Sequence, residues 1–152
     1  MQQFDDLKGI RRLIIISNMK PEEVDELYFQ VSNIKDITRT QLIRALKKRI
    51  KGLQQQKESK EWILVIKEAG SNKVIGKIEV MCLGGNKAFL KINMPNEVYS
   101  YKYGVRAIKQ FIKICSENNY FESILLNSGD IISERYRNSY DIEKLPVKVS
   151  FA

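Results

Sequence analysis

The 152 residues of the sequence include no histidine, and this limits the kinds of catalytic and metal site that the chain can form. Neither a Ser-His-Asp nor a Cys-His nucleophile can therefore form, and His-ligated zinc and iron sites are excluded as well. The two cysteines, Cys82 and Cys115, lie far apart in the chain with no CxxC pattern, which disfavours thiolate zinc and dithiol redox chemistry. Free cysteine is usually a small buried core residue. No GxxxxGK[ST] loop is present, so P-loop nucleotidases are excluded too.

Two other groups of residues remain as candidates. Glu79 stands among Ile78, Val80 and Met81 in an expected strand, where it is either a proton acceptor or the solvent-facing residue of an alternating strand. The polar, tyrosine-rich stretch 96–102 is expected to be a loop before a helix that opens near Tyr103. A helix N-terminus offers unpaired N–H groups to an anion. An ordinary loop before an amphipathic helix would have the same appearance.

The formal net charge of +8 is concentrated in one segment. Residues 38–60 contain eight basic residues and one acid, which gives +7 for that segment alone. We expect a helix there whose basic side chains point away from its apolar stripe. These basic residues are Arg44, Lys47, Lys48 and Lys51. A solvated face is favoured over a nucleic-acid surface, because no helix-turn-helix or RNA-binding motif accompanies the charge.

The elements that position these residues follow from hydrophobic periodicity. The order is β-α-α-β-β-β-α-β-α-β in a single α+β domain, residues 1–152. Strands are expected at 13–16, 62–69, 73–83, 87–93, 123–126 and 147–151, and helices at 21–32, from 38, from 103, and at 131–140. The strands from 62 to 93 should form an antiparallel meander, with 123–126 parallel beside 87–93.

The hydrophobic fraction of 43% suits a globular chain with a core. The longest apolar run, 62–66, is far shorter than the roughly 18 residues that span a bilayer. Acidic residues stand near the start, where a signal or transit peptide would be basic. A cytoplasmic location without membrane contact is therefore expected.

From Lys87 to Ala107 the chain resembles the cofactor-binding segment of the GNAT-type N-acetyltransferase superfamily. Met94-Pro95 is followed by a stretch in which Tyr103-Gly104-Val105-Arg106-Ala107 is similar to the family's Tyr-Gly-x-Glu-Ala. The family's Arg/Gln position is Tyr99 here, and its first glycine is Lys102. Trp62 with Val74-Ile75-Gly76 is similar to the family's "W…IG" pair. The branch most resembled acetylates ribosomal-protein N-termini and related amines.

The resemblance implies a GNAT-like fold: a mixed, mostly antiparallel sheet splayed at its centre and flanked by helices. It implies acetyl-CoA as co-substrate, without a metal, and a primary amine as the acceptor. The residues that would then bind the donor are Met94, Tyr99, Ser100, Tyr101, Lys102, Tyr103, Gly104 and Arg106. Lys102 in a glycine position restricts the approach of backbone to phosphate while it adds a positive charge.

The resemblance also implies direct attack of the amine on the thioester in a ternary complex. A tyrosine usually protonates the leaving thiolate, and the matching position is Tyr136, with Glu79 as the candidate base. Gly129 stands where the family has asparagine, and Tyr140-Asp141 where it has Gly-Phe.

Two functions stay open on the sequence. The first is an acetyl-CoA-dependent N-acetyltransferase. The alternative is a catalytically impaired protein of the same fold, with a degenerate cofactor loop, that binds a partner or nucleic acid. Nucleic acid is the disfavoured partner. The sequence does not identify the acceptor amine, and it does not distinguish a monomer from a homodimer.

Overall fold

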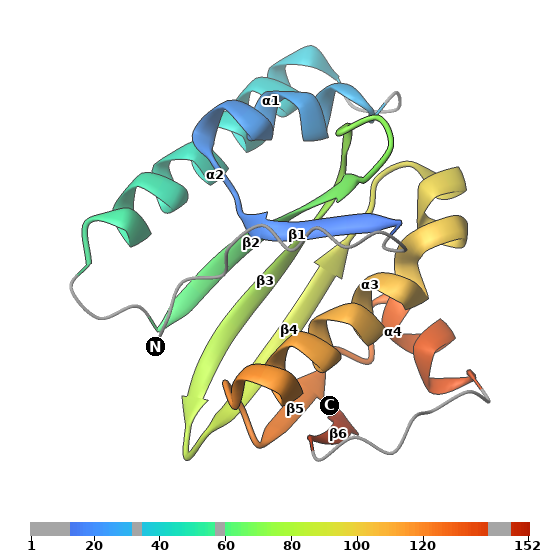
Figure 1. Ribbon diagram of the computed structural model, residues 1–152. Helices are drawn as coiled ribbons and strands as arrows, with labels where there is room; N and C mark the ends of the chain where they lie inside the picture. The colour runs from blue at the N-terminus through green and yellow to red at the C-terminus, as the bar shows by residue number, and fades with distance from the viewer. Residues whose placement is uncertain (1–12, 32–34, 57–59, 140–146) are drawn as a thin grey trace.

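The computed structural model describes residues 13–31, 35–56, 60–139 and 147–152. They form one six-stranded sheet with helices on both faces (Figure 1). The elements are β1 (Ile14–Asn18), α1 (Pro21–Phe29), α2 (Asp36–Gln54), β2 (Glu61–Glu68), β3 (Val74–Gly84), β4 (Lys87–Asn93), α3 (Glu97–Asn118), β5 (Ser123–Leu126), α4 (Ile131–Arg137) and β6 (Lys148–Phe151). This order is the one predicted. No helix in the described ranges is long and apolar enough to cross a membrane.

The strands lie in the sheet in their sequence order, β1 to β6. The first four pair antiparallel as a meander, whereas β5 pairs parallel with both β4 and β6. The crossover from β4 to β5 passes through α3, which is the connection that a parallel pair requires. The predicted meander and the parallel placement of β5 are both confirmed.

Alternation along β2 explains the two layers that cover the sheet. Leu64 and Ile66 face the larger hydrophobic cluster, which contains the buried residues of α3 and α4. Ile63 and Val65 face a second cluster formed with α1 and α2. A strand segment buried on both faces is expected to be apolar, as β2 is from Trp62 to Ile66.

Helix α3 begins at Glu97 and not near Tyr103, so the predicted loop at 96–102 is wrong. The side chain of Asn96 caps the helix and accepts bonds from the backbone N–H groups of Val98 (2.9 Å) and Tyr99 (3.4 Å). An asparagine N-cap satisfies amides that would otherwise lack a partner. The Tyr103 hydroxyl also donates to Glu68 Oε2 at 2.7 Å and holds the second turn of α3 on the end of β2.

Gly76 on β3 allows β4 to approach closely. A Cβ at this position would lie 2.8 Å from the backbone oxygen of Asn93 and 2.7 Å from Met94 Cγ. Because the carbonyl cannot move without β4, we predict that Gly76→Ala lowers the free energy of unfolding by about 1–3 kcal/mol. Urea unfolding measures this change.

Gly52 in α2 provides the matched control, since a Cβ there meets nothing within 4 Å. Gly52→Ala should be neutral or stabilise the protein by up to about 1 kcal/mol, because alanine is the better helix former. Equal stability of both variants would show that the β3–β4 approach at Gly76 is not close.

Candidate active site at the fork of the sheet

Strand β4 pairs with β5 over only its first four residues. Their pairing runs from Lys87 opposite Ser123 to Leu90 opposite Leu126. The backbone N–H of Asn127 then donates to the Leu90 oxygen at 3.3 Å, while β4 continues to Asn93. We call this place, where β4 runs on beyond the end of β5, the fork (Figure 1). Among the described residues, the stretch of β4 beyond Leu90 has no strand partner on that side.

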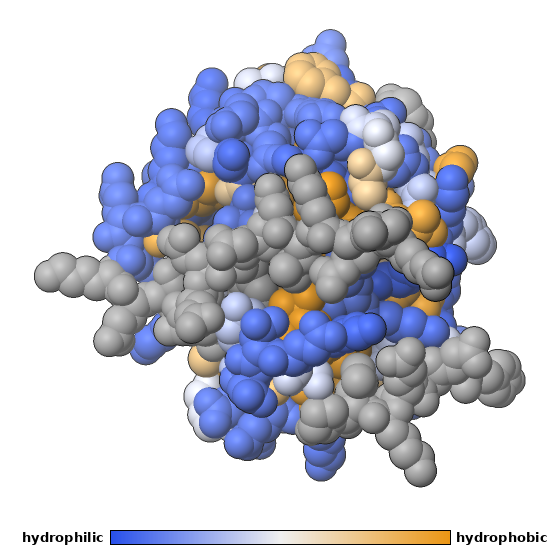
Figure 2. Space-filling model, in the orientation of Figure 1, coloured by the Kyte–Doolittle hydropathy of each residue, from blue (hydrophilic) through white to orange (hydrophobic). Residues whose placement is uncertain are grey.

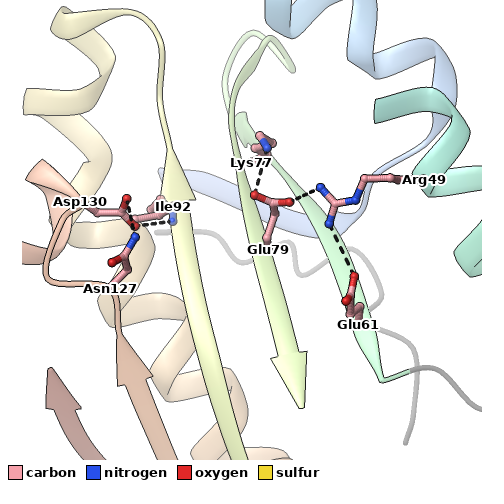
Figure 3. Close-up of polar contacts among 7 residues, drawn as sticks. All are labelled: Arg49, Glu61, Lys77, Glu79, Ile92, Asn127 and Asp130. Carbon is pink, nitrogen blue, oxygen red and sulfur yellow. Dashed lines mark hydrogen bonds and ion pairs between the residues drawn. The ribbon is translucent and has the colours of Figure 1, made fainter. Parts of the chain in front are cut away.

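Asp130 occupies the fork. Its Oδ2 accepts a hydrogen bond from the backbone N–H of Ile92 at 3.1 Å, and its Oδ1 accepts one from Asn127 Nδ2 at 3.4 Å. The Oδ1 of Asn127 accepts the N–H of Gly129 at 3.2 Å, which fixes the turn between β5 and α4. Figure 3 shows Asp130 reaching from this turn to the β4 backbone. The carboxylate thus takes the place of a strand partner.

The environment of Asp130 makes its carboxylate a better base than an exposed one. Partial burial raises its pKa, and the negative charge of Glu79 adds to that effect. The Ile92 N–H and the charge of Lys91 act in the opposite direction, but the net shift of the pKa is upward. A carboxylate with a raised pKa holds a transferred proton more firmly, as general-base catalysis near neutral pH requires.

Glu79, the base expected from sequence, lies instead in an ion-pair network (Figure 3). Its Oε1 binds Arg49 Nη1 of α2 at 2.6 Å, and its Oε2 binds Lys77 Nζ at 3.1 Å. Arg49 also reaches Glu61 on β2 at 3.5 Å. Burial raises the pKa of Glu79, but the two cations outweigh burial and the net shift is downward. The network ties α2 to β2 and β3 and leaves Glu79 a weak base.

We predict that Glu79→Gln destabilises the protein by about 1–3 kcal/mol at pH 7, because Lys77 and Arg49 lose a charged partner. A carboxylate with a lowered folded-state pKa contributes stability above its ordinary value of 4.5. That contribution is lost as the pH falls through the folded-state pKa. The difference between the two proteins should therefore shrink on acidification, as urea unfolding at several pH values would measure. A difference independent of pH would contradict the network.

Tyr136 lies in the short helix α4, which Asp130 precedes as the N-cap residue. Its side chain is 5% exposed, and its ring lies 6.5 Å from that of Phe151, centroid to centroid. Burial raises its pKa, so the phenol is neutral at pH 7. The Tyr136 hydroxyl has no hydrogen-bond partner among the described residues. Tyr136 and Glu79 are on different elements, and no direct contact joins them in the described part of the chain.

The predicted donor-binding residues lie inside helix α3 and do not form a backbone cradle. Amides within a helix bind carbonyls four residues earlier, so those of Lys102, Tyr103 and Gly104 are engaged within α3. Gly104 packs on Ile132 of α4, since a Cβ there would lie 3.0 Å from that side chain. The backbone of these residues therefore does not fit a diphosphate.

Several side chains of the predicted set are likewise engaged. Met94 is buried in the main core. The rings of Tyr99 and Tyr103 stack with their centroids 6.3 Å apart. The hydroxyl oxygen of Ser100 accepts a hydrogen bond from Arg135 Nη1 at 3.0 Å. Arg135 also lies 3.8 Å from the ring centroid of the exposed Tyr101. Because Tyr103 is buried, these three tyrosines cannot all stack on the bases of a nucleic acid.

Cationic side chains nevertheless surround the first turns of α3. Lys102 and Arg106 are exposed on α3 itself. Arg135 approaches from α4 through its contacts with Ser100 and Tyr101. These side chains could hold an anion where the backbone cannot. No group of three metal-ligating side chains is present among the residues that the structure describes.

Sequence reasoning missed Asp130, Asn127 and Arg135. The stretch Asn127-Ser128-Gly129-Asp130 has the residues of a turn before a helix, so the sequence could have placed Asp130 at the start of α4. Its bond to Ile92 joins residues 38 positions apart and has no local signal. Of the cysteines, Cys115 is buried as expected, and burial raises its pKa to about 12. Cys82 is half-buried.

No protein-family model matches the sequence, and no curated protein sequence matches it either. Solved structures do match the fold. A proposed ribosomal-protein-serine acetyltransferase from Vibrio cholerae superposes with a TM-score of 0.62 at 14% identity, over 91% of this chain and 83% of that one. A GNAT-family acetyltransferase from Bacillus anthracis gives 0.58 at 15% identity, over 79% and 71%.

A third match is the spermidine N-acetyltransferase of Vibrio cholerae in complex with CoA and spermine. It superposes with a TM-score of 0.57 at 11% identity, over 75% of this chain and 70% of that one. The chain therefore has the GNAT fold, and the fold that the sequence resemblance implied is confirmed.

Proposed function

We propose that this protein is an acyl-CoA-dependent N-acyltransferase, with acetyl-CoA as the donor and a primary amine as the acceptor. The observation that supports it most is the fork, where the edge of β4 beyond Leu90 has no strand partner and Asp130 stands with a raised pKa. Neighbours of the same fold are acetyltransferases, and one of them is a spermidine N-acetyltransferase in complex with CoA and spermine.

The reaction needs one proton acceptor and one proton donor. The amine attacks the thioester carbon, a C–N bond forms and the C–S bond breaks. We assign the ammonium proton to the Asp130 carboxylate, since its pKa is raised by burial. The Tyr136 hydroxyl, neutral at pH 7, is the proposed donor to the leaving thiolate. Glu79 in this proposal stabilises the sheet and takes no proton.

The donor's diphosphate would meet side chains more than backbone amides. The amides of Val98 and Tyr99 are already bonded to the Asn96 side chain. The exposed cations Lys102 and Arg106 and the nearby Arg135 are the groups proposed to neutralise the phosphates. Flexible side chains lose more conformational entropy when they bind a diphosphate than a preformed loop does. We therefore expect weak donor binding.

The capping of helix α3 by Asn96 also supports a second function. If the donor does not bind at all, the protein is a non-catalytic member of this fold that binds a partner. The occupied amides at the start of α3 are the observation in its favour. The two proposals differ in whether thiol is released when both substrates are present.

Thiol release from acetyl-CoA, measured with and without an amine, tests the proposal. Spermidine and a short peptide with a free N-terminal serine provide two classes of primary amine. We expect release above the amine-free rate with at least one of them, and product mass increased by one acetyl group. Absence of amine-dependent release with both, in protein whose thermal unfolding shows that it is folded, would favour the non-catalytic function.

A further inference from the structure

The basic residues of α2 fall into two groups. Three of them form ion pairs within the protein. Arg39 pairs with Asp36 and Lys47 pairs with Asp25. Arg49 pairs with both Glu61 and Glu79. The remaining three are exposed, and none has a carboxylate or hydrogen-bond partner among the described residues. These are Arg44, Lys48 and Lys51. We call them the α2 basic stripe.

The stripe lines a shallow groove of about 660 Å³ on the outer side of α2. The other side chains of the groove are mostly polar or small, with Ile43 as its one apolar member. In Figure 2 the surface over α1 and α2, at the upper left, is mostly hydrophilic. The apolar face of α2 is turned inward, because Leu46 and Ile50 are buried in the cluster with α1 and β2. The groove is thus lined by positively charged side chains.

The basic stretch of the sequence supplies the three cations of the stripe, which line this groove without a carboxylate partner among the described residues. Residues 38–60 supply +7 of the net +8. Such an asymmetric distribution steers an anionic partner to one face of a protein. The stripe therefore favours a partner that presents several negative charges in a row.

The geometry of the stripe suits a sugar-phosphate backbone. From Arg44 to Lys51 an α-helix rises about 10 Å, which corresponds to about three base-pair steps measured along the axis of a duplex. Thr40 and Gln55 at the two ends of the groove provide neutral donors of the kind that contact phosphates. A membrane surface fits less well, since an interfacial helix needs a continuous exposed apolar face, whereas Leu46 and Ile50 of α2 are buried and its exposed Ile37 and Leu42 lie outside the groove.

We propose that the α2 basic stripe binds the phosphate backbone of a nucleic acid without reading its sequence. Arg44, Lys48 and Lys51 would each neutralise about one phosphate. This site is separate from the fork and does not depend on the proposed acyl transfer. It also reverses the preference for a solvated face that composition alone favoured.

Fluorescence anisotropy with a 20-nucleotide mixed-sequence strand and its duplex tests the proposal. Three phosphate contacts predict that affinity falls about 20- to 40-fold between 50 and 200 mM salt. The triple variant Arg44→Gln/Lys48→Gln/Lys51→Gln should bind at least about tenfold more weakly at 50 mM salt and lose most of the salt dependence. Its thermal unfolding should match that of the wild type, because all three side chains are exposed.

The control variant removes the same three charges elsewhere, from the exposed Lys87, Lys113 and Lys148. It should keep nearly all of the affinity. Equal losses in both variants would show attraction by net charge alone and overturn the proposal. Absence of wild-type binding at 50 mM salt would overturn it too, as would binding to phosphatidylserine vesicles but not to either oligonucleotide.

Discussion

Replacing Asp130 by asparagine is expected to lower the kcat of acetyl transfer by about 10²–10⁴-fold. The amide oxygen of asparagine can still accept the Ile92 N–H, which now bonds to Asp130 Oδ2 at 3.1 Å. The substitution therefore removes the proton acceptor while it keeps the local hydrogen bond. In the wild type, kcat should rise with pH through the pKa of Asp130, which burial holds above its ordinary value of 3.8. The variant should lack that rise.

The stability of the Asp130→Asn variant distinguishes a catalytic role of Asp130 from a structural one. A carboxyl with a raised folded-state pKa contributes stability below its unfolded pKa, and this is lost as the pH rises through the folded-state pKa. At pH 7 the ionised Asp130 thus carries a desolvation cost that asparagine avoids. Asp130→Asn should be at least as stable as the wild type in thermal unfolding at pH 7.

The matched control is Asp36→Asn, which removes a carboxylate from a side chain that is 97% exposed. It should leave kcat and its pH profile unchanged. A fall in kcat for Asp130→Asn that is accompanied by an equal fall in stability would mean that Asp130 only holds the fork together. An unchanged kcat would exclude it as the base.

The second large effect is expected at Tyr136. Phenylalanine keeps the ring beside Phe151 and removes only the hydroxyl, so Tyr136→Phe should lower kcat by about 10²–10⁴-fold if that hydroxyl protonates the thiolate. The KM for acetyl-CoA should change little, since the ring remains in place. Single-turnover kinetics would separate the chemical step from product release.

Tyr101→Phe is the control for Tyr136, because this hydroxyl belongs to a side chain that is 75% exposed. It should leave kcat unchanged. If Tyr136→Phe also keeps full turnover, Tyr136 is a core residue and the thiolate takes its proton from another source.

The sheet could be predicted from sequence because its signals are local. β2 is apolar from Trp62 to Ile66, as expected for a strand with helices on both faces. Turns at Gly70-Ser71-Asn72 and Gly84-Gly85-Asn86 mark the ends of strands, and positive φ angles at Asn72 and Asn86 agree with turn conformations.

The start of α3 was mispredicted because a polar, tyrosine-rich stretch was interpreted as a loop. Its helical conformation depends on the Asn96 cap and on the bond from Tyr103 to Glu68, which lies 35 positions away. The cap is a local signal that could have been found. The bond from Tyr103 is a tertiary contact and could not.

The candidate site was less predictable than the fold, because its contacts join distant residues. Glu79 has an unremarkable place in an alternating strand until Arg49, 30 positions earlier, is brought to it. Asp130 becomes a candidate only when β4 is seen to run past β5. Pairing of side chains across elements decides which carboxylate has a raised pKa, and sequence periodicity does not contain that information.

Thermal unfolding in the presence of acetyl-CoA tests most directly whether the fork and the surrounding cations bind an acyl donor. A ligand that binds only the folded state stabilises it by about 2.7 kcal/mol at a hundredfold excess over its Kd, which for a chain of this size raises Tm by about 5–10 °C. We predict a Tm that rises with the logarithm of acetyl-CoA concentration, in the wild type and in Asp130→Asn alike. A Tm that stays constant up to millimolar acetyl-CoA in both proteins would contradict donor binding and, with it, the proposed acyl transfer.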